Sequence, residues 1–108
     1  MKFLSRKEEL ILLTIWKLKN NAYGVTIREQ IADSTGKYWS IGAVYDVLDR
    51  LVSKGYLYAE SSQPTAERGG KSKRFYFLTK KGHNLLLEIK SLEESMWADL
   101  PSPLLKKS

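Results

Sequence analysis

The sequence predicts a mainly α-helical fold with one small β-hairpin, namely a winged helix-turn-helix followed by a C-terminal dimerisation helix. Two observations predict it. Three amphipathic helical segments precede two short aromatic strands, and these strands flank a stretch rich in Ser, Gly and charge. A longer amphipathic helix then follows the second strand. We place the winged helix at residues 1–78 and the dimerisation helix with its loose tail at residues 79–108.

The first helix is expected over residues 6–19. Ser5 and Glu8 form an S-x-x-E capping box at its start, and the pair Asn20-Asn21 ends it because both side chains compete for backbone hydrogen bonds. Apolar side chains recur through it at the three- and four-residue spacing of one helical face, with Trp16 beside them. These are Leu10, Ile11, Leu13, Ile15 and Leu18.

The second and third helices are bounded by capping residues. The second is expected over residues 25–34, and Gly36 closes it as a C-terminal cap. In the third, Ser40 is the N-cap, the helix ends at Lys54, and Gly55 supplies the left-handed residue that follows. The apolar faces comprise Ile27 and Ile31 in the second helix and Val44, Val47, Leu48 and Leu51 in the third.

The hairpin and the last helix complete the chain. Residues 56–58 and 74–78 are short, aromatic and β-prone, and residues 61–73 suit a hairpin tip. Thr79 caps a last helix over residues 80–98. Its first turn carries Lys80 and Lys81, whose charges oppose the helix dipole, so we expect these lysines to have another role. An apolar seam of the kind that packs along another helix is predicted to form a dimer interface at Leu85, Ile89, Leu92 and Met96.

Composition bounds the class of protein. Hydrophobic residues make up 43%, aromatic residues 11% and charged residues 28% of the 108 residues, as in one folded domain. No apolar run approaches the roughly 20 residues of a membrane span, and the charged N-terminus does not resemble a signal peptide. The absence of cysteine excludes disulfides and thiolate metal sites, so we expect a cytoplasmic protein.

Catalysis has little support in the sequence. His83 is the only histidine, and no cluster of metal-ligating residues or phosphate-binding glycine loop is present. The adjacent carboxylates Glu8-Glu9 and Glu93-Glu94 point to different helix faces and are interpreted as ordinary helical surface. We therefore expect no enzyme activity, no cofactor and no metal.

Positive charge gathers at the hairpin tip. The formal net charge is +6, and residues 63–74 contribute +3 of it, from four basic side chains and one acidic one. Cations that neutralise phosphates release condensed counterions, and glycines let the backbone approach a phosphate closely. In a winged helix the tip reaches the DNA backbone beside the groove that holds the third helix. The alternative is a solvated tip. The candidate DNA contacts of this tip are Arg68, Gly69, Gly70, Lys71, Lys73 and Arg74.

The outward face of the third helix is less clearly suited to DNA. With the apolar face inward, Gly42, Asp46, Asp49 and Ser53 point outward, flanked by Tyr45 and Arg50. A carboxylate facing DNA is unfavourable unless it accepts from a cytosine amino group. We therefore interpret Asp46 and Arg50 as an i,i+4 pair that holds Arg50 toward a phosphate. The hydroxyls of Tyr38, Ser40 and Tyr45 are candidate donors to phosphate oxygens, and Gly42 allows close approach of the backbone.

The residues also resemble the PadR family of bacterial regulators. The resemblance covers about residues 4–98 and rests on the spacing of three separated motifs. These motifs are Ala22-Tyr23-Gly24; Gly42-Ala43-Val44-Tyr45 with Leu48-Asp49-Arg50-Leu51 and Lys54-Gly55-Tyr56; and Arg68-Gly69-Gly70-Lys71 with Arg74, Tyr76, Leu78-Thr79 and Gly82. Asp46 departs from the pattern, since relatives often have an uncharged residue there. The single short C-terminal helix resembles the compact branch of the family.

The resemblance implies a homodimeric repressor that binds a pseudo-palindromic operator in double-stranded DNA and is released by a small effector. It further implies that the last helix and the first form the dimer interface. In some compact relatives a tryptophan at this end of the last helix holds flat aromatic ligands, which makes Trp97 the candidate effector-pocket residue; the alternative is that Trp97 packs against the first helix. A second function remains open: a winged-helix protein-interaction module whose acidic third helix meets a basic protein surface.

Overall fold

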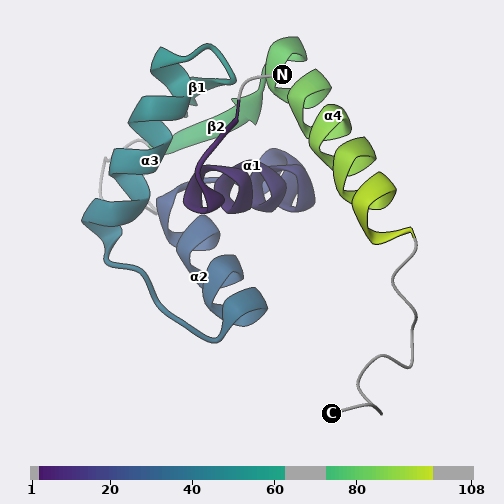
Figure 1. The fold of residues 1–108 in the computed structure, drawn as a ribbon. Coiled ribbons are helices and arrows are strands. Elements are labelled where there is room, and N and C mark those ends of the chain that lie inside the picture. Colours follow the sequence, from purple (N-terminus) through teal and green to yellow (C-terminus); the bar gives the residue numbers. More distant parts are fainter. Residues whose placement is uncertain (1–2, 63–72, 99–108) are drawn as a thin grey trace.

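The computed structural model describes residues 3–62 and 73–98 and confirms the predicted fold class (Figure 1). The tip residues 63–72 and the tail after residue 98 lie outside the described part. In chain order the elements are α1 (Arg6–Leu18), a short 3-10 turn η1 (Lys19–Asn21), α2 (Gly24–Thr35), α3 (Ile41–Ser53), β1 (Leu57–Ser61), β2 (Arg74–Leu78) and α4 (Lys80–Trp97).

Local side-chain caps begin the helices where the sequence places them. The Ser5 hydroxyl accepts from the Glu8 backbone N–H, while the Glu8 carboxylate accepts from the Ser5 N–H at 2.9 Å. The Ser40 and Thr79 hydroxyls accept from backbone N–H groups three residues further on and so cap α3 and α4. Each cap satisfies a backbone donor that the first helical turn leaves without a partner. The predicted starts of α1, α3 and α4 are therefore confirmed.

Positive backbone angles end two of the helices. Gly36 follows α2 with a φ of 77°, and Gly55 follows the last turn of α3 with a φ of 83°. A side chain at either angle would be strained, which is why glycine stands there. The helix α1 ends differently from the prediction: Lys19, with a φ of 54°, turns the chain into η1 before Asn20-Asn21.

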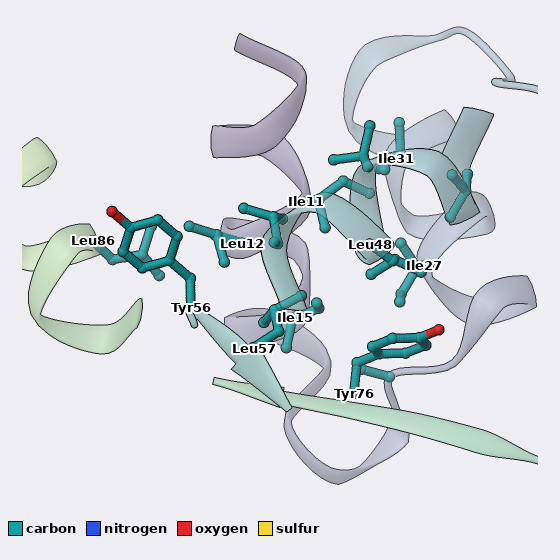
Figure 2. Packing of buried hydrophobic residues seen from close by; sticks show 14 of the residues in the cluster. Ile11, Leu12, Ile15, Ile27, Ile31, Leu48, Tyr56, Leu57, Tyr76 and Leu86 are labelled. Atoms are coloured by element: carbon teal, nitrogen blue, oxygen red, sulfur yellow. The ribbon is translucent and has the colours of Figure 1, made fainter. Parts of the chain in front are cut away.

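A single hydrophobic core joins all the elements (Figure 2). The Tyr76 ring points from β2 into the space between α1, α2 and α3 and is 1% exposed. One face of α4 belongs to this same core, through Leu85, Leu86 and Ile89. One predicted core position is wrong: Leu13 is 43% exposed, and Leu12 is buried in its place. The buried face of α1 is therefore rotated from the one that the spacing suggested, because α1 packs against both α2 and β2.

The hairpin is antiparallel and longer in its first strand than predicted. The register runs from Leu57↔Leu78 to Ser61↔Arg74, so that β1 covers five residues. Tyr56 lies just before the strand and is buried in the core. Because side chains alternate along a strand, Tyr76 faces the core, whereas Tyr58 and Phe77 stack on the outer face with ring centroids 5.2 Å apart.

The start of α4 is attached to the end of α3. The Lys81 ammonium donates to the Lys54 carbonyl at 2.9 Å, and the Thr79 hydroxyl donates to the Gly55 carbonyl at 2.6 Å. Gly82 packs directly on the Tyr56 carbonyl, where an added Cβ would overlap the oxygen. Lys81 thus supplies a donor to the carbonyls at the C-terminus of α3, which accounts for its place in the first turn of α4. Nothing in the structure explains Lys80.

The second half of α4 leaves the body of the protein, on the side away from α3 (Figure 1). Within the described residues, no side chain after Ile89 is buried. The exposed set still includes apolar side chains, namely Leu92, Met96 and Trp97. Among residues 3–62 and 73–98, no helix is long and apolar enough to cross a membrane.

Candidate nucleic-acid interface

The face of α3 that the sequence turns outward is exposed. Gly42, Asp46, Asp49 and Ser53 all lie at the surface, opposite the buried face of the helix. A Cβ added at Gly42 would meet no atom within 4 Å, so the first turn of α3 is open to an approaching backbone. Within the described part of the chain, neither Asp46 nor Asp49 takes part in an ion pair. Contact between this face and DNA stays a prediction.

Tyr45 is held by a close approach to α2. Its ring crosses the first residue of that helix, Gly24, where an added Cβ would overlap the phenolic hydroxyl. A side chain at position 24 would therefore displace the Tyr45 ring from this position, which gives a physical reason for the Tyr23-Gly24 motif. Tyr45 remains 41% exposed and stays a candidate donor to a phosphate.

The connection between α2 and α3 is held by Arg28, which the sequence analysis missed. The Arg28 Nε–H donates to the Trp39 carbonyl at 2.8 Å, and its guanidinium lies 5.2 Å from the Tyr38 ring centroid. Tyr38 itself is 69% exposed, so its hydroxyl is free to reach a ligand. The Ser40 hydroxyl already accepts from the Ala43 N–H at 3.1 Å as the cap of α3, which makes its first role structural. An arginine eleven residues before its carbonyl partner gives no local sequence signal.

Arg50 is paired with Glu8 instead of Asp46, so the predicted i,i+4 pair is wrong. The Arg50 Nε lies 3.9 Å from the Glu8 Oε2, and the Lys54 Nζ donates to the same oxygen at 2.7 Å. Glu8 is 4% exposed and not part of the ordinary helical surface, which corrects a second expectation. The reason is tertiary: α3 crosses the start of α1 and places its last two cations on that carboxylate.

The pKa of the Glu8 carboxyl is lowered. Burial alone would raise the pKa of Glu8, because it disfavours the charged form. Hydrogen bonds from Lys54 and from the Ser5 backbone and hydroxyl stabilise the carboxylate and together outweigh burial, so the net shift is downward. Glu8 is thus a buried anion at neutral pH that ties the N-terminus of α1 to the C-terminus of α3.

The wing is the hairpin formed by β1 and β2, and its two described candidate cations, Lys73 and Arg74, lie in different surroundings. The other predicted contacts lie outside the described residues, namely Arg68, Gly69, Gly70 and Lys71. Arg74 is exposed, with its guanidinium 5.5 Å from the Tyr76 ring centroid. Burial raises the pKa of Tyr76, and charges on Arg74, Asp49 and Tyr45 also act on that hydroxyl. Arg74 is the first residue of β2, whose start lies toward α3 in Figure 1. Lys73 lies instead over the Tyr23 ring, at 4.2 Å from its centroid.

The four residues of the predicted dimer seam differ in exposure: the first two are buried and the last two are exposed. Leu85 is 5% and Ile89 is 8% exposed, so both are core residues of this chain and have little surface left for a partner. Leu92 is 38% and Met96 is 76% exposed. Only the second half of the seam is therefore available to another molecule.

A groove of about 460 Å³ separates α4 from α1. Trp97 lines it and is 63% exposed, so it is not packed into the core against α1. Leu13 and Trp16 form the α1 wall. On α4 the lining includes Leu87, Lys90, Glu93, Glu94 and Trp97. In the described part of the chain, no group of three or more His, Cys, Asp or Glu side chains is placed to hold a metal ion.

An exposed third helix beside a basic hairpin, on a three-helix core, defines a winged helix-turn-helix DNA-binding protein. The chain belongs to the transcriptional regulator PadR-like family, whose family model matches residues 11–88. The PadR family comprises DNA-binding regulators of transcription. No curated protein sequence matches the chain.

Solved structures share the fold over nearly the whole chain. A PadR-like transcription factor from Bacteroides fragilis is 26% identical, with a TM-score of 0.67 over 94% of this chain and 89% of that one. A PadR family transcription regulator from hypervirulent Clostridium difficile R20291 is 24% identical, with a TM-score of 0.65 over 91% and 97%. RosR from H. salinarum is 21% identical, with a TM-score of 0.72 over 97% and 87%.

The lowered pKa of Glu8 leads to a test by acid unfolding. A carboxylate whose pKa is lower when folded stabilises the fold above its ordinary pKa of about 4.3, and this stabilisation is lost as the pH falls through the folded-state pKa. Glu8→Gln should lower the free energy of unfolding in urea by about 1–2 kcal/mol at pH 7, since Lys54 is partly exposed. The difference should narrow progressively below about pH 4. The neighbouring Glu9→Gln serves as the control. If Glu8→Gln lowered the free energy of unfolding equally at every pH, the lowered pKa of Glu8 would be contradicted.

Proposed function

We propose that this chain is a dimeric transcriptional repressor that binds a pseudo-palindromic operator and is released by a planar aromatic effector. The observation that carries the proposal is the separation of two surfaces. The exposed face of α3 and the start of β2 lie on one side of the core, and the free half of α4 leaves on the other (Figure 1). One side can thus contact DNA while the other contacts a second copy.

The wing supplies the attraction for DNA in this proposal. Two carboxylates, Asp46 and Asp49, occupy the outward face of α3, and Arg50 stands near the buried Glu8. The proposal assigns the attraction for phosphates to Arg74 and to the cations among residues 63–72, which lie outside the described residues. Phosphate contacts from these cations would set the position of the protein, and α3 would read base edges from its first turn at Gly42.

Arg74→Ala tests the wing contact. Loss of one phosphate contact should weaken binding to specific and random duplexes alike and reduce the slope of log K against log salt by about one unit. Fluorescence anisotropy over a salt series measures this slope. Lys90→Ala removes a cation from α4, far from α3, and should leave the slope unchanged. An unaltered slope in Arg74→Ala would remove Arg74 from the interface, and salt-independent binding to duplex DNA would favour the protein-interaction module.

Dimerisation is assigned to the second half of α4. Leu92, Met96 and Trp97 expose apolar surface on the two helical turns after the last buried residue of α4, Ile89. A small domain stabilises such a face by burying it against a second copy, at about 25 cal/mol per Å² of apolar area. A two-fold pair of helices would also bring two copies of α3 to the paired half-sites of an operator.

Leu92→Glu should therefore yield a monomer with weakened operator binding, because paired half-sites are no longer occupied together. Sedimentation velocity measures the association state, and circular dichroism shows whether the helices persist. Ser91→Glu adds the same charge one residue away, about 100° around the helix, and should remain dimeric. If Leu92→Glu is as dimeric as the parent protein, the interface lies elsewhere.

The groove between α1 and α4 is the proposed effector site. Its aromatic walls, Trp16 and Trp97, present flat apolar faces. The carboxylates Glu93 and Glu94 outnumber Lys90 in its lining, although Glu93 also lies 3.8 Å from the Arg6 guanidinium. Indole faces attract cations, and nearby carboxylates add to that attraction. The groove therefore favours a planar aromatic cation. A ligand there would lie beside Met96 and the proposed dimer interface, from which it could change how two copies of α3 are spaced.

Titration of a planar cationic dye tests this site. The parent protein should bind the dye with quenching of tryptophan fluorescence and with release of the operator, and Trp97→Ala should bind it more weakly. Because Trp16 and Trp39 also fluoresce, dye anisotropy is measured in parallel. Glu29→Gln, which changes an exposed carboxylate on α2, is the charge control. Equal dye binding by the parent protein and Trp97→Ala would show that Trp97 takes no part.

A further inference from the structure

The base of the wing docks on the segment that joins α1 to α2. Tyr23 forms an isolated antiparallel bridge with Phe75 of β2, and the Tyr76 N–H donates to the Ala22 carbonyl at 2.8 Å. The Tyr23 and Phe75 rings meet edge to face, with centroids 5.4 Å apart. This single bridge and the hydrogen bond beside it join the start of β2 to the residues that precede α2.

Lys73 also packs on this contact, over the face of the Tyr23 ring. Its ammonium lies 4.2 Å from the Tyr23 ring centroid, the shortest cation–ring distance among the described residues. The side chain is half-buried, and its backbone is held as well: the Lys73 N–H donates to the Ser62 hydroxyl at 2.9 Å, and the Ser62 N–H donates to the Lys73 carbonyl at 2.7 Å. The Tyr23 ring therefore holds the side chain of Lys73, and the two hydrogen bonds with Ser62 hold its backbone.

The same segment is also in contact with α3. Gly24, next to Tyr23, lies directly under the Tyr45 ring. Lys73 of the wing and Tyr45 of α3 therefore pack on neighbouring residues at the start of α2. Residues 23–24 therefore contact both the wing and α3, the two elements that would contact DNA in the proposed function.

We propose that Lys73 is a positioning residue: its cation–π contact with Tyr23 sets the direction in which the wing leaves the core, and Lys73 does not contact a phosphate. The inference rests on the proposed DNA binding and assigns different tasks to two adjacent cations. Arg74 is exposed at the start of β2 with its guanidinium over the Tyr76 ring, whereas Lys73 is half-buried over the ring of Tyr23, the residue that precedes α2. This assignment replaces the prediction that Lys73 belongs to the phosphate-binding set.

A double-mutant cycle separates the two roles. If Lys73 acts through the ring, Lys73→Gln and Tyr23→Leu should each weaken DNA binding by about twofold to fivefold, the range of an exposed cation–π contact. The double variant should be no weaker than either single variant, because both remove the same contact. The salt slope should be unchanged in all three, whereas Arg74→Gln should reduce it by about one unit. Lys73→Arg and Tyr23→Phe keep a cation and a ring and should bind as the parent protein does.

The opposite pattern would overturn the proposal. A phosphate contact predicts that Lys73→Gln reduces the salt slope by about one unit, that Tyr23→Leu does not, and that their effects multiply in the double variant. Since Lys73→Gln changes only a side chain at the surface of the hairpin, its result does not depend on the folding of Tyr23→Leu.

A measurement without DNA keeps the two proposals distinguishable. Protons on the Lys73 ε-carbon lie in the ring current of Tyr23, so their NMR signals should be shifted upfield in the free protein and return to ordinary values in Tyr23→Leu. Ordinary shifts in the parent protein would overturn the positioning role whatever the DNA result. Shifted signals in a protein that binds no duplex would instead refute the proposed function and leave the contact intact.

Discussion

The rest of the structure depends on one buried carboxylate, that of Glu8. It accepts from Lys54 at 2.7 Å and from the Ser5 backbone at 2.9 Å, and so joins the first turn of α1 to the last turn of α3. A buried anion is stable only where such donors surround it, so the two helix ends cannot separate without leaving a charge unpaired. From Lys54 the connection continues, since its carbonyl accepts from Lys81 at the start of α4. This one junction thus positions the end of α3 against α1 and the start of α4 against α3.

This junction leaves two unlike surfaces at the ends of a small core. Toward α3, Arg74 is exposed at the start of β2, and the outward face of α3 carries the acidic side chains Asp46 and Asp49. Toward α4, the groove beside Trp97 has carboxylates at its edge. In the proposed function, an anionic polymer and a cationic ligand would therefore occupy separate surfaces. The rigid connection between α3 and α4 is what would let a change at one surface alter the other.

Close backbone contacts explain why particular glycines stand where they do. At Gly24 and Gly82 the limit is space, because a Cβ would overlap the Tyr45 hydroxyl in one case and the Tyr56 carbonyl in the other. At Gly55 the limit is the backbone angle, a φ of 83°. All three lie where α3 meets a neighbour. These glycines of the motifs that resemble the PadR family therefore have a structural reason, which lies in packing and backbone geometry.

The sequence by itself determined what depends on neighbours along the chain. The caps at Ser5, Ser40 and Thr79, the left-handed turns at Gly36 and Gly55, and the buried face of α3 follow from hydrogen bonds and periodicities within a few residues. Only the tertiary structure decided which charges pair and which apolar residues stay exposed. Glu8 is buried because α3 crosses it, and Arg50 turns to Glu8 because that carboxylate is closer to it than solvent-facing Asp46. Leu85 and Leu92 share a seam in the sequence, yet one is core and the other surface, because the body of the protein ends at Ile89 while the helix continues. Helical spacing tells which side chains share a face, and what covers that face depends on elements far away in the chain.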